Sequence, residues 1–201
     1  MCQRNINFNM MKYLFLKQGI YLPIVYFGTV IIAGLFASDY SHIGQHASEL
    51  AINENQTAGS IFTIGVFITG ISAIIYGIGL ILKFKTQFTI TSILTIVFGI
   101  TFLFGAIYKI GSPWHGLYGI GLSIMMLPFA FLYEMKSYDL NRMTKVISIL
   151  SALIIFLYFW AMVARLDPME QRGLTQRIFG IVVFGFFSYS AYVTNNLKHV
   201  K

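Results

Sequence analysis

Residues 146–164 read VISILSALIIFLYFWAMVA, a run that contains no Asp, Glu, Lys or Arg. About 20 such residues in an α-helix span the roughly 30 Å hydrocarbon core of a bilayer. Five further stretches without these charged residues are similarly long, at residues 18–38, 55–82, 86–108, 110–133 and 178–197. The pattern predicts an all-α membrane protein, a bundle of six transmembrane helices.

The composition of the chain excludes most other classes of protein. Hydrophobic residues make up 57% of the sequence and charged residues 10%, so six helices apolar on every side would leave little surface suited to water. A membrane β-barrel is also excluded, because its strands are alternating segments of about ten residues. We expect one transmembrane domain, residues 18–197, between an N-terminal tail, residues 1–17, and a C-terminal tail, residues 198–201.

The positive charges predict how the protein sits in the membrane, because cytoplasmic connections carry an excess of Lys and Arg. If both termini are cytoplasmic, ten of the fourteen Lys and Arg residues lie on the cytoplasmic side. The net charge of +7 is explained by this topology and by contact with the bilayer. It does not indicate a nucleic-acid partner, because no basic patch is interleaved with aromatic residues outside the spans.

The first connection is polar and lies on the predicted outer side. If residues 39–53 form a helix, the helix is amphipathic. One side then carries Asp39, His42, Gln45, His46, Glu49 and Asn53, and another carries Tyr40, Ile43, Ala47, Leu50 and Ala51. His42 and His46 are four residues apart, a spacing that suits two metal ligands on one helix. A polar helix face at the membrane surface has the same composition, so we expect no metal and no cofactor.

Three connections on the outer side bring potentially chemical residues to one membrane level. Glu49, His115 and Arg177 are the candidate catalytic residues, because a carboxylate, an imidazole and a guanidinium at a half-dehydrated bundle mouth can perturb one another or hold a ligand. The candidate ligand-binding residues around them are Ser48, Gln176, Arg172, Asp39 and His42. The alternative is a structural ion-pair network between Glu49 and Arg177.

The order of several short motifs resembles a known family. Tyr40 with Ser48-Glu49-Leu50, then His115-Gly116, then Gly173-Leu174 and Gln176-Arg177 resembles the prokaryotic six-helix membrane family catalogued as domain of unknown function 998, over residues 18–195. This resemblance implies the architecture, the external polar cluster and a bacterial or archaeal inner membrane. It implies no particular reaction.

Three functions are compatible with the sequence. The first is an enzyme or binding protein for a lipid-linked, amphiphilic or anionic lipid ligand, and it predicts a polar pocket at the outer mouth. The second is a non-catalytic accessory module, which predicts buried pairs without a cavity. The third is a small transporter, which requires a polar path across the bundle. Every Asp, Glu, Lys and Arg falls near the end of a span, which argues against a proton-coupled transporter.

Overall fold

The computed structural model describes residues 2–138, 141–164, 166 and 168–197. Every regular element in this part of the chain is helical, and six segments are long and apolar enough to cross a membrane. The all-α, six-span prediction is therefore confirmed. The elements are α1 (Cys2–Leu35), η1 (Ala47–Ile52), α2 (Gln56–Phe84), α3 (Thr89–Ile107), η2 (Leu117–Met126), α4 (Leu127–Glu134), η3 (Met135–Ser137), α5 (Arg142–Val163), η4 (Met169–Gln171) and α6 (Arg172–Asn196), where η denotes a 3-10 helix.

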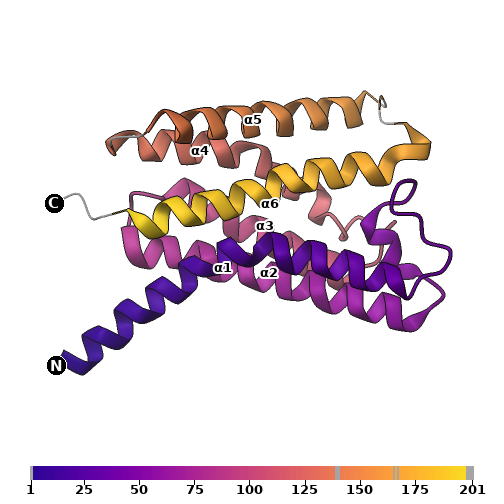
Figure 1. Cartoon of the computed structure of the whole chain (residues 1–201), viewed down its shortest axis with the longest axis horizontal. Coiled ribbons are helices and arrows are strands. Elements are labelled where there is room, and N and C mark those ends of the chain that lie inside the picture. The colour runs from indigo at the N-terminus through magenta and orange to yellow at the C-terminus, as the bar shows by residue number, and fades with distance from the viewer. Residues whose placement is uncertain (1, 139–140, 165, 167, 198–201) are drawn as a thin grey trace.

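The helices pack side by side, roughly along one direction (Figure 1). α2 packs against α1 and α3, and α1 also packs against α6, while α5 packs against α4 and α6. α1 begins and α6 ends at the same end of the bundle (Figure 1). The connection between α1 and α2 and that between α5 and α6 lie together at the opposite end (Figure 1), which we call the clamp end.

Glycines allow the closest helix contact. A Cβ atom on Gly70 of α2 would lie 2.8 Å from the main-chain oxygen of Gly99 on α3, and a Cβ on Gly99 would lie 2.6 Å from that of Gly70. No side chain fits between the two backbones at this crossing. Such small residues are common where membrane helices approach closely, because dispersion contacts rather than water exclusion hold the helices together.

The first helix begins much earlier than its apolar run. α1 starts at Cys2, whereas the charge-free stretch starts at residue 18. Lys17 does not interrupt the helix, and its ammonium lies 4.3 Å from the ring centre of Tyr13, one turn earlier. Long cationic side chains can reach the interface from within a helix. The first residue of the apolar run therefore does not mark the first residue of the helix. The predicted C-terminal tail, residues 198–201, lies outside the described residues.

The fourth span differs from the regular helix predicted for residues 110–133. Residues 108–116 form turns, η2 follows, and only α4 has α-helical geometry. Positive φ angles occur at Gly111, Leu117, Tyr118 and Gly119, with values of 94°, 47°, 52° and 83°. These left-handed conformations, together with Pro113, prevent a continuous α-helix.

The first connection is also less regular than an amphipathic helix over residues 39–53. Only η1 is helical, and residues 37–46 form turns. Within η1, Ala47 and Leu50 are buried against α1 and α2, in a cluster that includes Val30 and Phe62. The segment therefore has an apolar side that packs on the bundle, but the predicted helical face from Asp39 to His46 is not formed.

At the end of the bundle opposite the clamp end, two charged side chains cap the ends of neighbouring helices. The carboxylate of Glu134 accepts hydrogen bonds from the main-chain nitrogens of Ile90 (2.6 Å) and Thr91 (2.9 Å) at the start of α3. Lys83 donates to two main-chain oxygens in the last turn of α6, at 2.7 and 3.0 Å. An anion at a helix start and a cation at a helix end both satisfy otherwise unpaired backbone groups.

Candidate functional site

The first connection is fastened to the start of α6 by a network that we call the clamp, formed by Tyr40, Gln45, Glu49, Arg172 and Arg177. Arg172 forms an ion pair with Glu49, with Nη2 3.1 Å from Oε1, and its Nε donates to the main-chain oxygen of Gly44 at 3.0 Å. The side chains of Arg172 and Glu49 are 33% and 19% exposed. Glu49 also accepts a 2.8 Å hydrogen bond from the main-chain nitrogen of His46 at the start of η1.

Arg177 occupies the inner part of the clamp and contacts no carboxylate among the described residues. Its Nη1 donates to the main-chain oxygens of Gln45 (3.1 Å) and Gly173 (2.6 Å), and its Nη2 donates to the hydroxyl of Tyr40. The predicted pairing of Glu49 with Arg177 is therefore wrong. Arg172, the first residue of α6, takes the carboxylate, and Arg177, about 7.5 Å further along the helix, bonds to the turns before η1 instead.

Burial and the guanidinium of Arg177 change the pKa values of Tyr40 in the clamp and of His42 beside it. Burial raises the pKa of the Tyr40 hydroxyl above its ordinary value, although the charge of Arg177 opposes the shift. Burial lowers the pKa of His42, and the charge of Arg177 lowers it further. The His42 ring packs edge-on against Tyr40, and its Nδ1 lies 3.4 Å from Nη2 of Arg177. A cation this close disfavours protonation of the imidazole.

The metal alternative receives no support from this geometry. The segment from His42 to His46 consists of turns, so the helical spacing that suggested two ligands on one face does not apply. Among the described residues, no group of three His, Cys, Asp or Glu side chains is placed to hold a metal ion.

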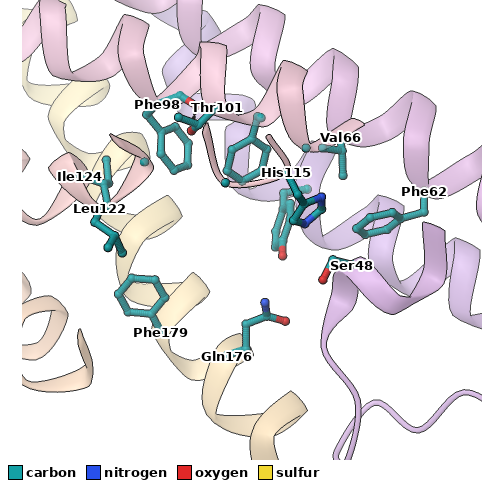
Figure 2. Close-up of a pocket in the computed structure, with 15 residues that line it drawn as sticks. Ser48, Phe62, Val66, Phe98, Thr101, His115, Leu122, Ile124, Gln176 and Phe179 are labelled. Atoms are coloured by element: carbon teal, nitrogen blue, oxygen red, sulfur yellow. Dashed lines mark hydrogen bonds between the residues drawn. The ribbon is translucent and has the colours of Figure 1, made fainter. Parts of the chain in front are cut away.

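Beside the clamp lies a cavity of about 360 Å³. Its wall is mostly apolar and comes from α1, α2, α3, η2 and α6, with aromatic rings prominent (Figure 2). The lining residues are Tyr26, Ser48, Phe62, Val66, Phe98, Thr101, Phe102, Gly105, His115, Gly116, Gly121, Leu122, Ile124, Gln176 and Phe179. This volume, with many apolar and few polar side chains, is typical of a small-molecule site.

Five lining residues carry a polar side-chain group: Tyr26, Thr101 and three that come from η1, from the turns before η2 and from α6. Ser48 comes from η1, His115 from the turns before η2, and Gln176 from α6 (Figure 2). The clamp places Ser48 and Gln176, since Oε1 of Gln176 accepts a 2.8 Å hydrogen bond from the main-chain nitrogen of Ala47. The hydroxyl of Thr101 is already bonded to the main-chain oxygen of Phe98 at 2.7 Å. We call Ser48, His115 and Gln176 the polar trio.

The break in the fourth span creates room for the polar trio. Nδ1 of His115 lies 2.7 Å from the main-chain oxygen of Tyr108, which orients the imidazole. The ring also lies beside Gly105 of α3: a Cβ atom on that glycine would be 3.8 Å from Cε1 of His115. Irregular backbone within a membrane protein is tolerated where it is buried in protein or lines a cavity. The turns before η2 meet this condition, because His115 and Gly116 both line the cavity.

The structure thus divides the predicted cluster into two neighbouring groups. Ser48, His115 and Gln176 line the cavity, whereas Glu49, Arg172 and Arg177 belong to the clamp, with His42 against it. Asp39 is exposed and accepts a hydrogen bond from the hydroxyl of Ser38.

The sequence interpretation missed the apolar wall. Its clearest members are Phe62, Phe98, Phe102 and Phe179. In a membrane helix, a phenylalanine that faces lipid and one that faces a cavity give the same pattern. Only the density of glycine and proline between residues 111 and 121 could have indicated the break beside which the cavity forms.

Comparison with known proteins gives one result. A family model described as "Protein of unknown function (DUF998)" matches residues 21–191. No curated protein and no solved structure matches the chain. The matched range includes the clamp, the polar trio and the whole wall of the cavity.

Proposed function

The chain belongs to the DUF998 family of proteins of unknown function, and we propose that this member binds an amphiphilic molecule in the cavity. The observation that carries the proposal is the cavity itself, about 360 Å³ with a mostly apolar, aromatic wall that also includes the polar trio. A hydrocarbon chain fits the wall, and a polar head fits the trio. The bilayer around the six spans is a direct source of such molecules.

The alternative of a purely structural module explains the clamp but not the cavity. The clamp ties the first connection to α6 through an ion pair and several main-chain hydrogen bonds. The structural alternative predicts buried pairs without a cavity, so a cavity of this size beside a well-bonded clamp supports ligand binding.

A transport function has less support. The hydroxyls that could form a polar path through α3 bond to their own helix: Ser92 to the oxygen of Phe88, Thr95 to that of Thr91, and Thr101 to that of Phe98. Such intrahelical bonds remove a hydroxyl from any shared polar path. Binding is the function that the contacts support best.

The location that we propose is the cell membrane of a bacterium or archaeon, with the clamp end on the extracytoplasmic side. The excess of Lys and Arg in the tails and in the connections at the other end supports this orientation. The ligand would then come from the outer leaflet.

The test is ligand-induced thermal stabilisation of the purified protein in detergent, with a monoacylglycerol as the probe. A ligand at 100 times its dissociation constant stabilises the folded state by about 2.7 kcal/mol. Val66→Phe fills part of the cavity and should abolish this stabilisation. Ile68→Phe, on the same helix but 47% exposed, is the matched control and should retain it. The proposal fails if no amphiphile stabilises the wild type, or if both variants retain the full effect.

Val66→Phe can also lower the stability of the unliganded protein by overpacking. Ser48→Ala provides a second variant without that difficulty. The Ser48 hydroxyl makes no hydrogen bond within the described part of the chain, so its removal should leave the unliganded midpoint unchanged and weaken binding.

A further inference from the structure

The hydrogen-bonding character of Gln176 is determined by the main chain. Its side-chain amide contacts the main-chain N–H of Ala47, and an N–H can only donate. The contacting atom is therefore the oxygen, Oε1, as the 2.8 Å contact places it. The amide nitrogen, with its two hydrogens, is left pointing into the cavity (Figure 2). Gln176 presents a donor.

The tautomer of a neutral His115 follows from the same reasoning. Nδ1 lies 2.7 Å from the main-chain oxygen of Tyr108, and a carbonyl oxygen can only accept. Nδ1 must carry the proton, which leaves Nε2 with a lone pair. His115 therefore presents Nε2 as a hydrogen-bond acceptor, and its ring lies across from Gln176 of α6 (Figure 2).

Ser48 completes the trio with a hydroxyl that can donate or accept. It lies on η1, between His115 and Gln176 in projection, and its oxygen faces the same space (Figure 2). The polar groups that line the cavity thus include a donor, an acceptor and a hydroxyl that can serve as either, and the phenol of Tyr26 is a second hydroxyl of that kind.

No charge balances a charged ligand inside the cavity. None of the described lining residues is Asp, Glu, Lys or Arg. The two nearby guanidinium groups do not line the cavity: Arg172 binds Glu49 and Gly44, and the Nη atoms of Arg177 bind Gln45, Gly173 and Tyr40, while its buried Nε has no partner among the described residues. A carboxylate or phosphate placed against the trio would lose its hydration without gaining a counter-charge, which is strongly unfavourable.

From this pattern we propose that the ligand is a neutral lipid whose head carries a hydroxyl group. This inference rests on the proposed function. A hydroxyl accepts a hydrogen bond from the amide nitrogen of Gln176 and donates one to Nε2 of His115, so both fixed partners are satisfied by one small group. A second hydroxyl or an ester oxygen, as in a monoacylglycerol, can pair with Ser48. The acyl chain lies along the aromatic wall.

The experiment compares ligands that share a twelve-carbon chain and differ only in the head: monolauroylglycerol, laurate and dodecyl phosphate. Binding is measured at neutral pH by quenching of Trp114 fluorescence in a Trp160→Phe background, with chains brominated at the terminal carbon. Trp114 is the neighbour of His115, and Trp160 is the only other tryptophan. We expect monolauroylglycerol to bind at least about tenfold more tightly than either anion, roughly the effect of one hydrogen bond or more.

Two substitutions test the assigned hydrogen-bonding roles without removing the main-chain contacts. Gln176→Glu keeps an oxygen for the N–H of Ala47 and replaces the donor with a carboxylate oxygen. His115→Asn keeps an N–H for the oxygen of Tyr108 and removes the acceptor at Nε2. Each should weaken binding of monolauroylglycerol by about tenfold. His115→Asn should leave the thermal midpoint of the unliganded protein within about 2 °C of the wild type. Gln176→Glu should lower that midpoint, because it also places a carboxylate without a counter-charge in the cavity.

The outcomes separate this inference from the proposed function. If laurate or dodecyl phosphate binds as tightly as monolauroylglycerol, the ligand is not a neutral lipid with a hydroxyl head, although the cavity still binds an amphiphile. The same conclusion follows if neither substitution weakens the binding of monolauroylglycerol. If none of the three probes binds to the wild type, the proposed function is overturned together with the inference.

Discussion

Replacing Gly173 by alanine should loosen the first connection from α6. Gly173 lies in the first turn of α6, where the turns of the first connection press directly against the helix backbone. A Cβ atom at this position would lie 2.3 Å from the main-chain oxygen of Gln45 and 2.8 Å from that of His42. Both are main-chain atoms, so no change of rotamer relieves the overlap. The whole segment must move away from α6.

The cost follows from the contacts that this movement breaks. The main-chain nitrogen of Leu174 donates to the oxygen of Ile43 at 2.9 Å, and Arg177 donates to the oxygen of Gln45 at 3.1 Å. Overpacking costs about 1–3 kcal/mol, and each lost hydrogen bond costs about 1 kcal/mol. The higher helix propensity of alanine returns up to about 1 kcal/mol. The net destabilisation should be about 2–4 kcal/mol.

Gly185→Ala is the matched control, because Gly185 lies in the same helix and an added Cβ meets no atom within 4 Å. We expect this variant to equal the wild type or to exceed it by up to about 1 kcal/mol. The assay is thermal unfolding in detergent, where about 2–4 °C corresponds to 1 kcal/mol for a chain of this size. Gly173→Ala should therefore unfold roughly 5–15 °C below the control. Equal midpoints for the two variants would show that the first connection is not pressed against α6.

Three further substitutions test separate contacts. Glu49→Gln removes the ion pair with Arg172 but keeps an acceptor for the start of η1, so it should lower the free energy of unfolding by less than about 1 kcal/mol. Glu49→Ala should cost about 1 kcal/mol more, because the hydrogen bond that caps η1 is also lost. Equal costs for the two variants would contradict the capping role. The pKa of His42 is lower in the folded protein than in the unfolded chain, because of burial and the charge of Arg177. Neutral His42 therefore contributes its full stability above its ordinary pKa of about 6.5. That contribution is lost as the pH falls through the lower pKa of the folded state. The midpoint should accordingly drop between pH 7 and pH 5, and His42→Gln should flatten that dependence; an unchanged slope would contradict the assignment. Lys83→Met removes two hydrogen bonds to the last turn of α6 and should lower stability by about 1–3 kcal/mol in the same assay, so an unchanged midpoint would argue that these bonds contribute nothing.

The number and approximate positions of the spans could be predicted because burial in lipid demands long apolar segments. The run from residue 146 to residue 164 corresponds closely to α5, Arg142–Val163. Helix ends were less predictable, because they depend on capping rather than on hydropathy. The side chain of Asn141 accepts a hydrogen bond from the main-chain nitrogen of Thr144 and starts α5 ahead of the apolar run. Lys17 likewise lies inside α1 although it interrupts the hydropathy signal.

The break in the fourth span could not be derived from hydropathy. Residues 110–133 are as free of charge as the other spans, so the pattern predicts a helix. Whether a glycine in such a run packs against a neighbour or adopts a positive φ depends on the surrounding backbone. Gly119 has a φ of 83°, while Gly116 does not have a positive φ. The non-glycine residues Leu117 and Tyr118 are also left-handed, a conformation that single-residue propensities disfavour.

The structure places the predicted cluster at one end of the bundle, but it pairs the charged residues differently. Alternating topology alone places Glu49, His115 and Arg177 at one end of the bundle, which the structure confirms. Topology does not determine which arginine near the start of α6 meets the carboxylate. Glu49 therefore pairs with Arg172, and His115 lines the neighbouring cavity with Gln176.

The clamp and the cavity are mechanically linked through Gln176, whose oxygen holds η1 and whose nitrogen faces the cavity. Any change that moves η1 also moves Ser48, so clamp variants such as Gly173→Ala should weaken ligand binding without touching the ligand. A loss of binding therefore identifies a contact residue only when the unliganded protein keeps its stability. Ser48→Ala should keep the stability of the unliganded protein, because the Ser48 hydroxyl has no hydrogen-bond partner among the described residues. Conversely, a ligand that bridges Gln176 and His115 connects α6 to the broken fourth span and should raise the thermal midpoint even of destabilised clamp variants that still bind it.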